Sequence, residues 1–276
     1  MALEHEYLHL LERCLNAPLR ETRNAKVHSV FSASLSHNLA DSFPLLTTKR
    51  VFFRGVIEEL AWFLRGSTNV SELQERGIKI WDKNAESFDP IHKLDAGGIY
   101  GFLWRYFGAK YQDCHTDYTG QGIDQVASVI RGIKEDPHSR RHILNAWNPT
   151  TPASLPPCHV LYQFYVHEDT LSVQMYQRSA DLFLGVPFNI ASTALLTHLI
   201  AHEVDMNVGT MNITFGDCHI YENHTEAVME QIGRFPRQLP QLSIVRPKDG
   251  LWHVDADEIT LLNYSAEPTI RAEMIA

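Results

Sequence analysis

Residues 155–189 read LPPCHVLYQFYVHEDTLSVQMYQRSADLFLGVPFN, and this stretch decides the fold prediction. Its segments 159–166 and 170–177 are rich in the β-branched and aromatic residues that favour strands. The polar tripeptide at 167–169 separates them, which predicts a β-hairpin. Residues 188–204 are long and apolar enough to form a buried helix. The stretch therefore predicts two paired strands followed by a core helix.

Working outward from this stretch, hydrophobic periodicity predicts further helices and strands. They are a helix at 3–15, a strand with Phe31, Ala33, Leu35 and Leu39 on one side, helices at 51–64 and 123–133, and strands at 142–147, 241–245 and 258–264. Residues 17–27 are polar and predict an irregular connection. Because strands and helices mix without regular βαβ alternation, we expect an α+β fold with a mixed central sheet and flanking helices. No repeat or long linker interrupts residues 1–276, which favours a single domain.

The composition is that of an acidic globular protein, with 44% hydrophobic residues, 21% charged residues and a net charge of −9. Bulk nucleic-acid binding needs a basic surplus and is not expected. No signal peptide or run of about 18 apolar residues is visible, so we expect no membrane association. The four cysteines lack CxxC spacing, which favours reduced thiols in the cytoplasm. His198 and His202 stand four apart without an evident third ligand, so no metal site is predicted.

The candidate chemistry lies at the ends of the predicted hairpin. Cys158 follows two prolines and starts the first strand, whereas Arg178 ends the second. A cysteine becomes a nucleophile when a cation favours its thiolate, and Arg178 can do this while it grips a phosphate. Asn189 offers one acceptor and two donors, which suits the edge of a heterocycle. Cys158 alone would favour a buried structural thiol, but Arg178, Asp181 and Asn189 nearby favour attack on a small phosphorylated heterocycle.

Three further features each leave two alternatives open. Arg140 and Arg141 follow a helix end, where they are either solvated or an anion grip that reaches another subunit. Glu59 in the apolar helix is either a helix-face charge or a partly buried acid with a raised pKa. His219 and Tyr221 share one face of an extended segment, as a sugar-hydroxyl site or as a satisfied core pair.

The chain resembles the folate-dependent thymidylate synthase family over nearly its whole length. Many ordered matches carry the resemblance, and no single short motif does so. The matches are FPLLTTKR at 43–50, ELAWF at 59–63, IWD at 80–82, YG at 100–101, SRR at 139–141, LPPCH at 155–159, QRS at 177–179, Asp181, FNIAS at 188–192 and DCHIY at 217–221. The resemblance implies an α+β fold, a symmetric homodimer with shared active sites, and methylation of dUMP to dTMP with 5,10-methylenetetrahydrofolate.

The resemblance also implies roles for individual residues. Cys158 would add to C6 of uracil, Tyr100 would assist removal of the C5 proton, and Glu59 would organise proton transfer through water. The remaining implied nucleotide-binding or catalytic residues are Arg23, Arg140 and Arg141 (the latter two from the partner), His159, Gln177, Arg178, Ser179, Asn189, His219 and Tyr221. Those implied on the folate side are Lys49, Ile80, Trp81, Asp181, Leu184, Gly185, Phe188 and Ala276.

Two departures from the family pattern concern closure over the folate. The family's phosphate loop usually reads Arg-Thr-Gly-Thr-Gly, whereas residues 22–27 read TRNAKV, without glycine and with the arginine displaced by one position. The tail ends in AEMIA at 272–276. Because closure excludes water from hydride transfer, a hydroxymethylase that forms 5-hydroxymethyl-dUMP is an alternative. A weakened homologue with a binding or regulatory role is a second alternative, against which the intact Cys158 and the acidic chain argue.

Overall fold

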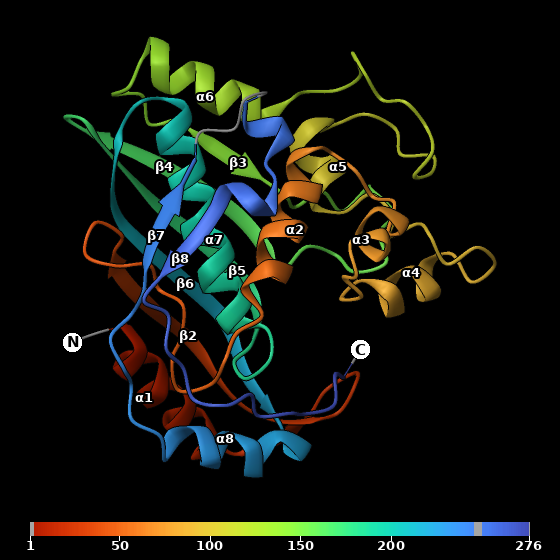
Figure 1. Cartoon of the computed structure of the whole chain (residues 1–276). Coiled ribbons are helices and arrows are strands. Elements are labelled where there is room, and N and C mark those ends of the chain that lie inside the picture. The colour runs from red at the N-terminus through yellow and green to blue at the C-terminus, as the bar shows by residue number, and fades with distance from the viewer. Residues whose placement is uncertain (1–2, 246–249, 276) are drawn as a thin grey trace.

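A six-stranded mixed sheet organises the computed structural model, which describes residues 3–245 and 250–275 (Figure 1). The strands follow the order β1-β2-β6-β5-β4-β3, and only β5 and β6 are parallel neighbours. Their bounds are β1 Leu19–Glu21, β2 Lys26–Asn38, β3 Ile143–Asn145, β4 His159–His167, β5 Thr170–Asp181 and β6 Asn207–Tyr221. A separate ribbon pairs β7 (Gln241–Ile244) with β8 (Ile259–Leu262). The predicted α+β class is confirmed.

The helices gather on one side of the sheet. Helix α7 packs on β5 and β6, and α2 packs on α7, so two layers enclose the core. The α-helices are α1 Leu3–Leu15, α2 Phe53–Leu64, α3 Ser71–Glu75, α4 Asp82–Phe88, α5 Tyr100–Arg105, α6 Gln125–Glu135, α7 Val186–Glu203 and α8 Thr225–Ile232, with 3-10 turns at Glu222–His224, Leu251–His253 and Ala256–Glu258. Within the described ranges, no helix is long and apolar enough to cross a membrane.

The predicted hairpin is confirmed and determines where the chemistry lies. His167 pairs with Thr170 across a tight turn in which Glu168 takes a φ of 53°. Strand β5 runs four residues beyond the predicted end, because Ser179, Ala180 and Asp181 still pair with β6 after the ladder with β4 has ended at Gln177. This extension contains Arg178, whose N–H donates to the Cys158 carbonyl, and Asp181, which lies beside His219 of β6.

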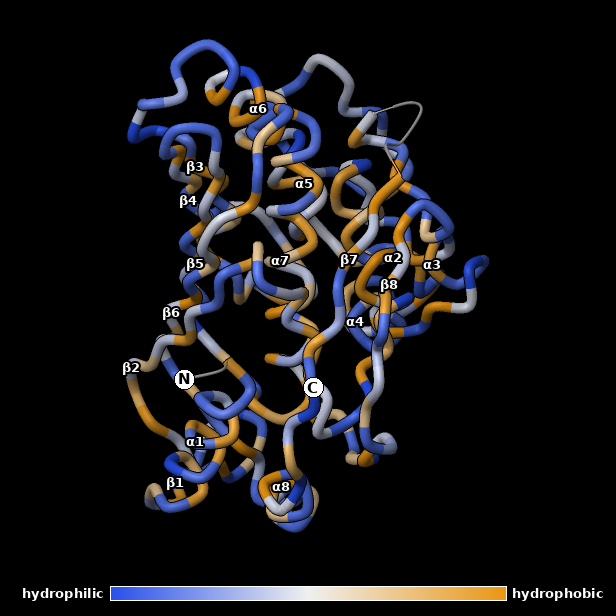
Figure 2. Tube along the Cα trace, turned by 60° about the vertical axis from the view of Figure 1, so that its left-hand side comes forward, coloured by the Kyte–Doolittle hydropathy of each residue, from blue (hydrophilic) through white to orange (hydrophobic). Residues whose placement is uncertain are grey.

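The other face of the sheet is open. Along β4, β5 and β6, inward side chains are buried and alternate with outward side chains such as Tyr165, Ser172, Gln174, Tyr176 and Thr214. Tyr165 is 60% exposed and Tyr176 is 38% exposed. In Figure 2 the six strands of the main sheet form the left-hand layer of the protein, and α7 and α2 lie to their right. An open sheet face that carries aromatic side chains is suited to contact another protein surface.

Three sequence predictions around the sheet were wrong. Residues 17–27 are not wholly irregular, since β1 pairs with the start of β2. Phe31 does not share a buried face with Leu35: Phe31 is 81% exposed and Leu35 is 2% exposed. Between them Ser32 has a φ of 68°, which interrupts the regular alternation of the strand. The long strand β6 was predicted only near its end, at 217–221.

Candidate active site

Cys158 is positioned by contacts from segments distant in the sequence. Its backbone N–H donates to the hydroxyl of Tyr100 (2.7 Å), which also accepts from the N–H of His159 (3.3 Å). Its carbonyl accepts from the N–H of Arg178 (2.9 Å). Tyr100 lies in the first turn of α5 and is buried, so the thiol-bearing segment is tied to both the helical layer and β5.

Charge and burial act in opposite directions on the Cys158 thiol. Burial raises its pKa, and the guanidinium of Arg178 opposes this effect. Arg178 donates to the carbonyls of Pro156 (2.6 Å) and Pro157 (3.0 Å), and it lies 5.3 Å from the ring of Trp147. The effect of Arg178 on the thiolate has the predicted direction, but burial is the larger influence. Two of the five N–H donors of this guanidinium are thereby used, which leaves others for an anion.

Glu59 has the environment of a partly buried acid. It lies on α2 and accepts a hydrogen bond from the indole N–H of Trp81 (2.7 Å). Burial raises the pKa of Glu59 to about 7, with the Trp81 hydrogen bond opposing. The neighbouring Glu58 is instead paired with Arg76 (2.9 Å). A carboxyl with a pKa near 7 can both accept and donate a proton at neutral pH, which favours the second of the two sequence interpretations.

A network of amides and rings forms the inner wall. The amide of Gln177 donates to the side-chain oxygen of Asn189 and to the carbonyl of Ser179, both at 2.9 Å. The Nδ1 of His159 and the hydroxyl of Tyr162 are 2.9 Å apart. Burial lowers the pKa of His159 to about 4, so its imidazole is neutral at pH 7. Since the oxygen of Asn189 is already accepting, its NH2 donors are oriented by the network.

Strand β6 supplies the opposite side of the site. The parallel register places Ser179 beside Asp217 and Asp181 beside His219. Nδ1 of His219 lies 3.1 Å from Oδ1 of Asp217, and the ring of Tyr221 is 5.2 Å from that of His219. Burial raises the pKa of Tyr221, as do the nearby charges of Asp181 and Cys158, so these groups share one region.

Asp217 received no role from its sequence motif. Its pKa is lowered, first by the hydrogen bond with His219 and further by Arg20. A carboxylate two positions before a histidine on one strand face was the available signal.

The residues expected on the folate side lie at the start of α7 and beside Trp81. Asp181 accepts from the N–H groups of Phe183 (3.0 Å) and Leu184 (3.1 Å), which closes the turn into the helix. At Gly185 an added Cβ would lie 3.2 Å from the Asp181 carbonyl. Ile80, Leu184 and Phe188 are partly buried apolar side chains.

Lys49 differs from an exposed cation. Its ammonium lies 3.4 Å from the centre of the Phe183 ring and donates to the Phe183 carbonyl. Burial lowers the pKa of Lys49 to about 7. The predicted contact at Ala276 lies outside the described residues.

Of the three other predicted arginines, Arg140 and Arg141 lie far from Cys158 within this chain, whereas Arg23 lies near Tyr221. Arg140 and Arg141 are exposed and precede β3, where the His142 carbonyl accepts from the N–H of Phe164 (2.9 Å). Phe164 is six residues along β4 from Cys158, about 20 Å at the usual rise per residue. Arg23 is exposed in the turn between β1 and β2, and its charge opposes the raised pKa of Tyr221.

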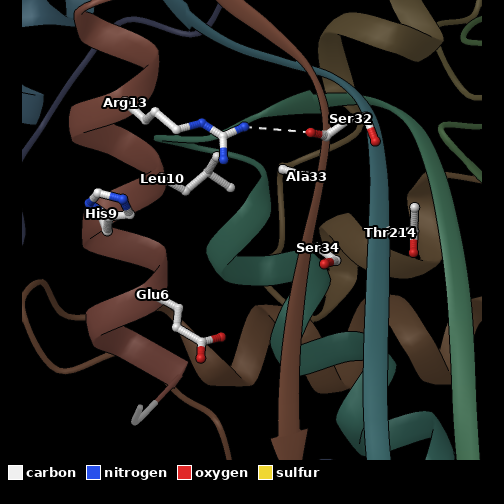
Figure 3. A pocket seen from close by; sticks show the side chains of 8 residues that line it. All are labelled: Glu6, His9, Leu10, Arg13, Ser32, Ala33, Ser34 and Thr214. Atoms are coloured by element: carbon white, nitrogen blue, oxygen red, sulfur yellow. Dashed lines mark hydrogen bonds between the residues drawn. The ribbon is translucent and has the colours of Figure 1, made fainter.

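One cavity of the described structure lies apart from this cluster. It has a volume of about 470 Å³ and lies between α1 and strands β2 and β6, where Arg13 donates to the Ser32 carbonyl at 3.5 Å (Figure 3). Its lining residues are Glu6, His9, Leu10, Arg13, Ser32, Ala33, Ser34 and Thr214. None of them belongs to the predicted site. Over the described part of the chain, no group of three metal-ligating side chains is found.

Comparison with known proteins gives one consistent family. The protein-family model described as thymidylate synthase matches residues 5–276. The chain is 46% identical to thymidylate synthase of Homo sapiens, over 98% of this chain and 90% of that protein. It is 47% identical to thymidylate synthase of equine herpesvirus 2, over 98% of each. It is also 47% identical to a bifunctional dihydrofolate reductase-thymidylate synthase of Paramecium tetraurelia, of which it spans 61%.

Proposed function

The chain belongs to the thymidylate synthase family, and from this premise we propose that it converts dUMP to dTMP with 5,10-methylenetetrahydrofolate as one-carbon and hydride donor. The observation that carries the proposal is the meeting of Cys158, Tyr100 and Arg178 through the hydrogen bonds of the Cys158 backbone. In this proposal residues 1–276 act as one catalytic domain, and the protein is a methyltransferase. Its free, reduced cysteines agree with a cytoplasmic location.

The nucleotide would lie between the end of β5 and the end of β6. Arg178 would hold the phosphate with its remaining donors, assisted by Ser179 and by Arg23 from the adjacent turn. The oriented NH2 group of Asn189 would donate to the O4 edge of uracil, and Gln177 would hold Asn189 in place. His219 and Tyr221 would bind the 3′-hydroxyl of the deoxyribose.

Cys158 would provide covalent catalysis. Its thiol would give its proton, through water, to Glu59 as Sγ forms a bond to C6, and the electrons of the C5–C6 double bond would move towards C5 and O4. This turns C5, a poor nucleophile in uracil, into an enolate carbon. Arg178 favours the thiolate electrostatically, and the donor groups of Asn189 stabilise charge at O4.

Proton transfer would be divided between Glu59 and Tyr100. Glu59, with its pKa near 7, would exchange protons with the ring edge through water. The hydroxyl oxygen of Tyr100 accepts two backbone N–H bonds, so its own proton is free to bind a group near C5. Burial raises the pKa of Tyr100 well above its ordinary value, which keeps this proton in place at neutral pH. The neutral His159 beside it would support the same water network.

The folate would bind against the apolar side chains next to these groups. Ile80, Trp81, Leu184 and Phe188 would offer apolar contacts, and the second carboxylate oxygen of Asp181 would remain for a pterin donor. Gly185 would permit close approach at the start of α7, and Lys49 and Ala276 would lie towards the tail of the folate. The folate supplies the methylene carbon and then a hydride, for which the apolar contacts would exclude water.

We further propose a symmetric homodimer with shared active sites. The open face of the sheet carries the exposed rings of Tyr165 and Tyr176 among polar side chains, and aromatic residues are enriched where protein surfaces pair. Arg140 and Arg141, remote from Cys158 within one chain, would reach the phosphate in the site of the partner. A two-fold axis across the sheet face would then complete both sites together.

Product analysis tests the proposed activity. The purified protein is incubated with dUMP and 5,10-methylenetetrahydrofolate, and the nucleotide products are identified by mass spectrometry. We expect dTMP, with dihydrofolate formed in equal amount. Predominance of 5-hydroxymethyl-dUMP would show that water captures the methylene group, and an unchanged dUMP pool would contradict the proposal.

A further inference from the structure

An arginine that neither the sequence motifs nor the proposed mechanism uses lies beside the sugar end of the site. Arg20, in the short edge strand β1, forms an ion pair with Oδ2 of Asp217 in β6. Its Nε also donates to the hydroxyl of Ser29 in β2 (2.6 Å). The side chain therefore crosses β2 and connects β1 to β6. An exposed ion pair alone does little to fix the position of a side chain, but this guanidinium is held by two hydrogen-bond partners.

Asp217 passes this connection to His219. Its other oxygen, Oδ1, lies 3.1 Å from Nδ1 of His219, whose side chain is only 12% exposed. A carboxylate is an acceptor only, so Nδ1 of His219 must carry the proton in this contact. In the neutral imidazole, Nε2 is then an acceptor. The contact fixes both the orientation of the ring and the nitrogen that can receive a hydroxyl proton.

The turn that carries β1 is fixed as well. The hydroxyl of Thr22 donates to the Ala25 carbonyl (2.6 Å), and the N–H of Thr22 donates to the same oxygen (3.0 Å). Within the described chain, positive φ angles occur at neither Thr22 nor the next three residues. Where the family pattern has a glycine-rich loop, this chain has a closed hairpin that holds Arg20 against Asp217.

We propose that Arg20 and Asp217 are positioning residues for the nucleotide sugar, acting through His219. Arg20 fixes the position of Asp217, and Asp217 fixes the Nδ1–H form of His219. Nε2 of His219 then accepts a hydrogen bond from the 3′-hydroxyl group. This inference rests on the proposed function for the identity of the nucleotide. It adds two residues to the recognition of the 3′-hydroxyl and assigns a use to the altered hairpin.

The test compares dUMP with 2′,3′-dideoxy-UMP, which differs only by the missing 3′-hydroxyl. The ratio of kcat/KM for the two nucleotides is measured in the wild type, in Arg20→Met and in Asp217→Asn. We expect each substitution to lower kcat/KM for dUMP about fivefold to tenfold, the value of one well-placed hydrogen bond. For the dideoxy nucleotide, kcat/KM should stay within about twofold of the wild-type value, because this nucleotide lacks the 3′-hydroxyl group that His219 binds. Discrimination between the two nucleotides therefore falls.

A matched control lies on the same hairpin. Lys26 pairs with Glu21 at 3.6 Å in an exposed ion pair that does not involve Asp217. Lys26→Met should leave the discrimination ratio unchanged, and Arg20→Lys should restore part of it. Equal losses on both nucleotides, or an unchanged ratio in both Arg20→Met and Asp217→Asn, would overturn the inference. In either case dTMP formation by the wild type would leave the proposed function standing, whereas a wild type without dTMP formation would remove that function first.

Discussion

The candidate site has two regions that differ in what sets their chemistry: an inner wall of buried and partly buried groups around Cys158, and an outer rim of more exposed charged groups towards the nucleotide phosphate and sugar. On the wall, Tyr100 and His159 are buried and Glu59 is partly buried, and burial is the main cause of each shifted pKa. On the rim, Arg20 and Asp217 remain partly exposed, and the lowered pKa of Asp217 is caused chiefly by its hydrogen bond. Burial creates unusual acids and bases, whereas pairing at the rim creates orientation.

This difference predicts which substitutions affect the chemical step. A wall residue takes part in proton transfer during the reaction, so its replacement should lower kcat. A rim residue fixes the position of the nucleotide, so its replacement should act on kcat/KM and on discrimination between nucleotides.

The largest effect is expected at the nucleophile. Cys158→Ser should retain dUMP binding but lower turnover by about 10⁴-fold or more, because no nearby group can ionise a serine hydroxyl. Steady-state dTMP formation and equilibrium binding of dUMP measure the two quantities separately. Cys114→Ser is a control at another partly buried thiol and should keep full activity. Substantial turnover by Cys158→Ser would reveal a different nucleophile.

The next effect concerns the raised pKa on the wall. Glu59→Gln should lower kcat about 100-fold, since the amide cannot exchange a proton with the ring edge. Glu58→Gln is the matched control on α2, because Glu58 is committed to Arg76. We expect that control to keep most of the activity. Equal losses in both variants would indicate damage to the helix and not loss of a proton-transfer group.

The same carboxyl has a measurable effect on stability. The pKa of Glu59 is about 7 in the folded protein, against an ordinary 4.5, so the folded state binds more protons between these values. The contribution of Glu59 to the free energy of unfolding therefore falls as pH rises from about 4.5 to 7, by up to about 3 kcal/mol. In denaturant titrations, Glu59→Gln should gain stability relative to the wild type between pH 4 and pH 8. A constant difference across that range would contradict the raised pKa.

A third prediction tests whether the rim is completed by a partner. Arg140→Ala should lower kcat/KM for dUMP by about 10- to 100-fold, the range expected for a hydrogen bond between charged groups. Mixing inactive Cys158→Ser with Arg140→Ala under conditions of subunit exchange should recover about a quarter of the wild-type sites. Half of the dimers are then mixed, and each holds one site with both elements intact. No recovery despite demonstrated exchange would place Arg140 in the site of its own chain.

The elements of the fold differ in how far the sequence predicts them. The hairpin of β4 and β5 and helix α1 carry clear periodic patterns, and both were found where the patterns indicated. The first half of β6 was missed although Met211, Ile213 and Phe215 alternate with polar residues, so the signal was present. The positive φ of Ser32 has no such signal, because serine rarely adopts it without tertiary support.

Within the site, the motifs indicated the wall residues but not the contacts of the rim. Cys158, Arg178 and Asn189 lie within one short stretch, so their proximity follows from the hairpin and the helix that it precedes. Arg20 and Asp217 are 197 positions apart and meet only because β1 and β6 flank β2 in the sheet. Strand order is a tertiary property that residue spacing does not determine.

The smallest effect is expected in the hairpin turn at 22–25. No residue of this turn has a positive φ, so the folded turn does not require glycine at any position. Ala25→Gly therefore only increases the conformational entropy of the unfolded chain. We expect a loss of about 0.5–1 kcal/mol in the free energy of unfolding, measured by denaturant titration, and a dTMP share of product that stays unchanged. Thr22→Val removes the hydroxyl that donates to the Ala25 carbonyl at 2.6 Å and keeps the side-chain shape. This variant should lower the discrimination between dUMP and 2′,3′-dideoxy-UMP more than Ala25→Gly does, since it loosens the strand that holds Arg20. If Ala25→Gly instead increased dTMP formation, the closed turn would be a hindrance to closure, and the rim would serve the chemical step as well as orientation.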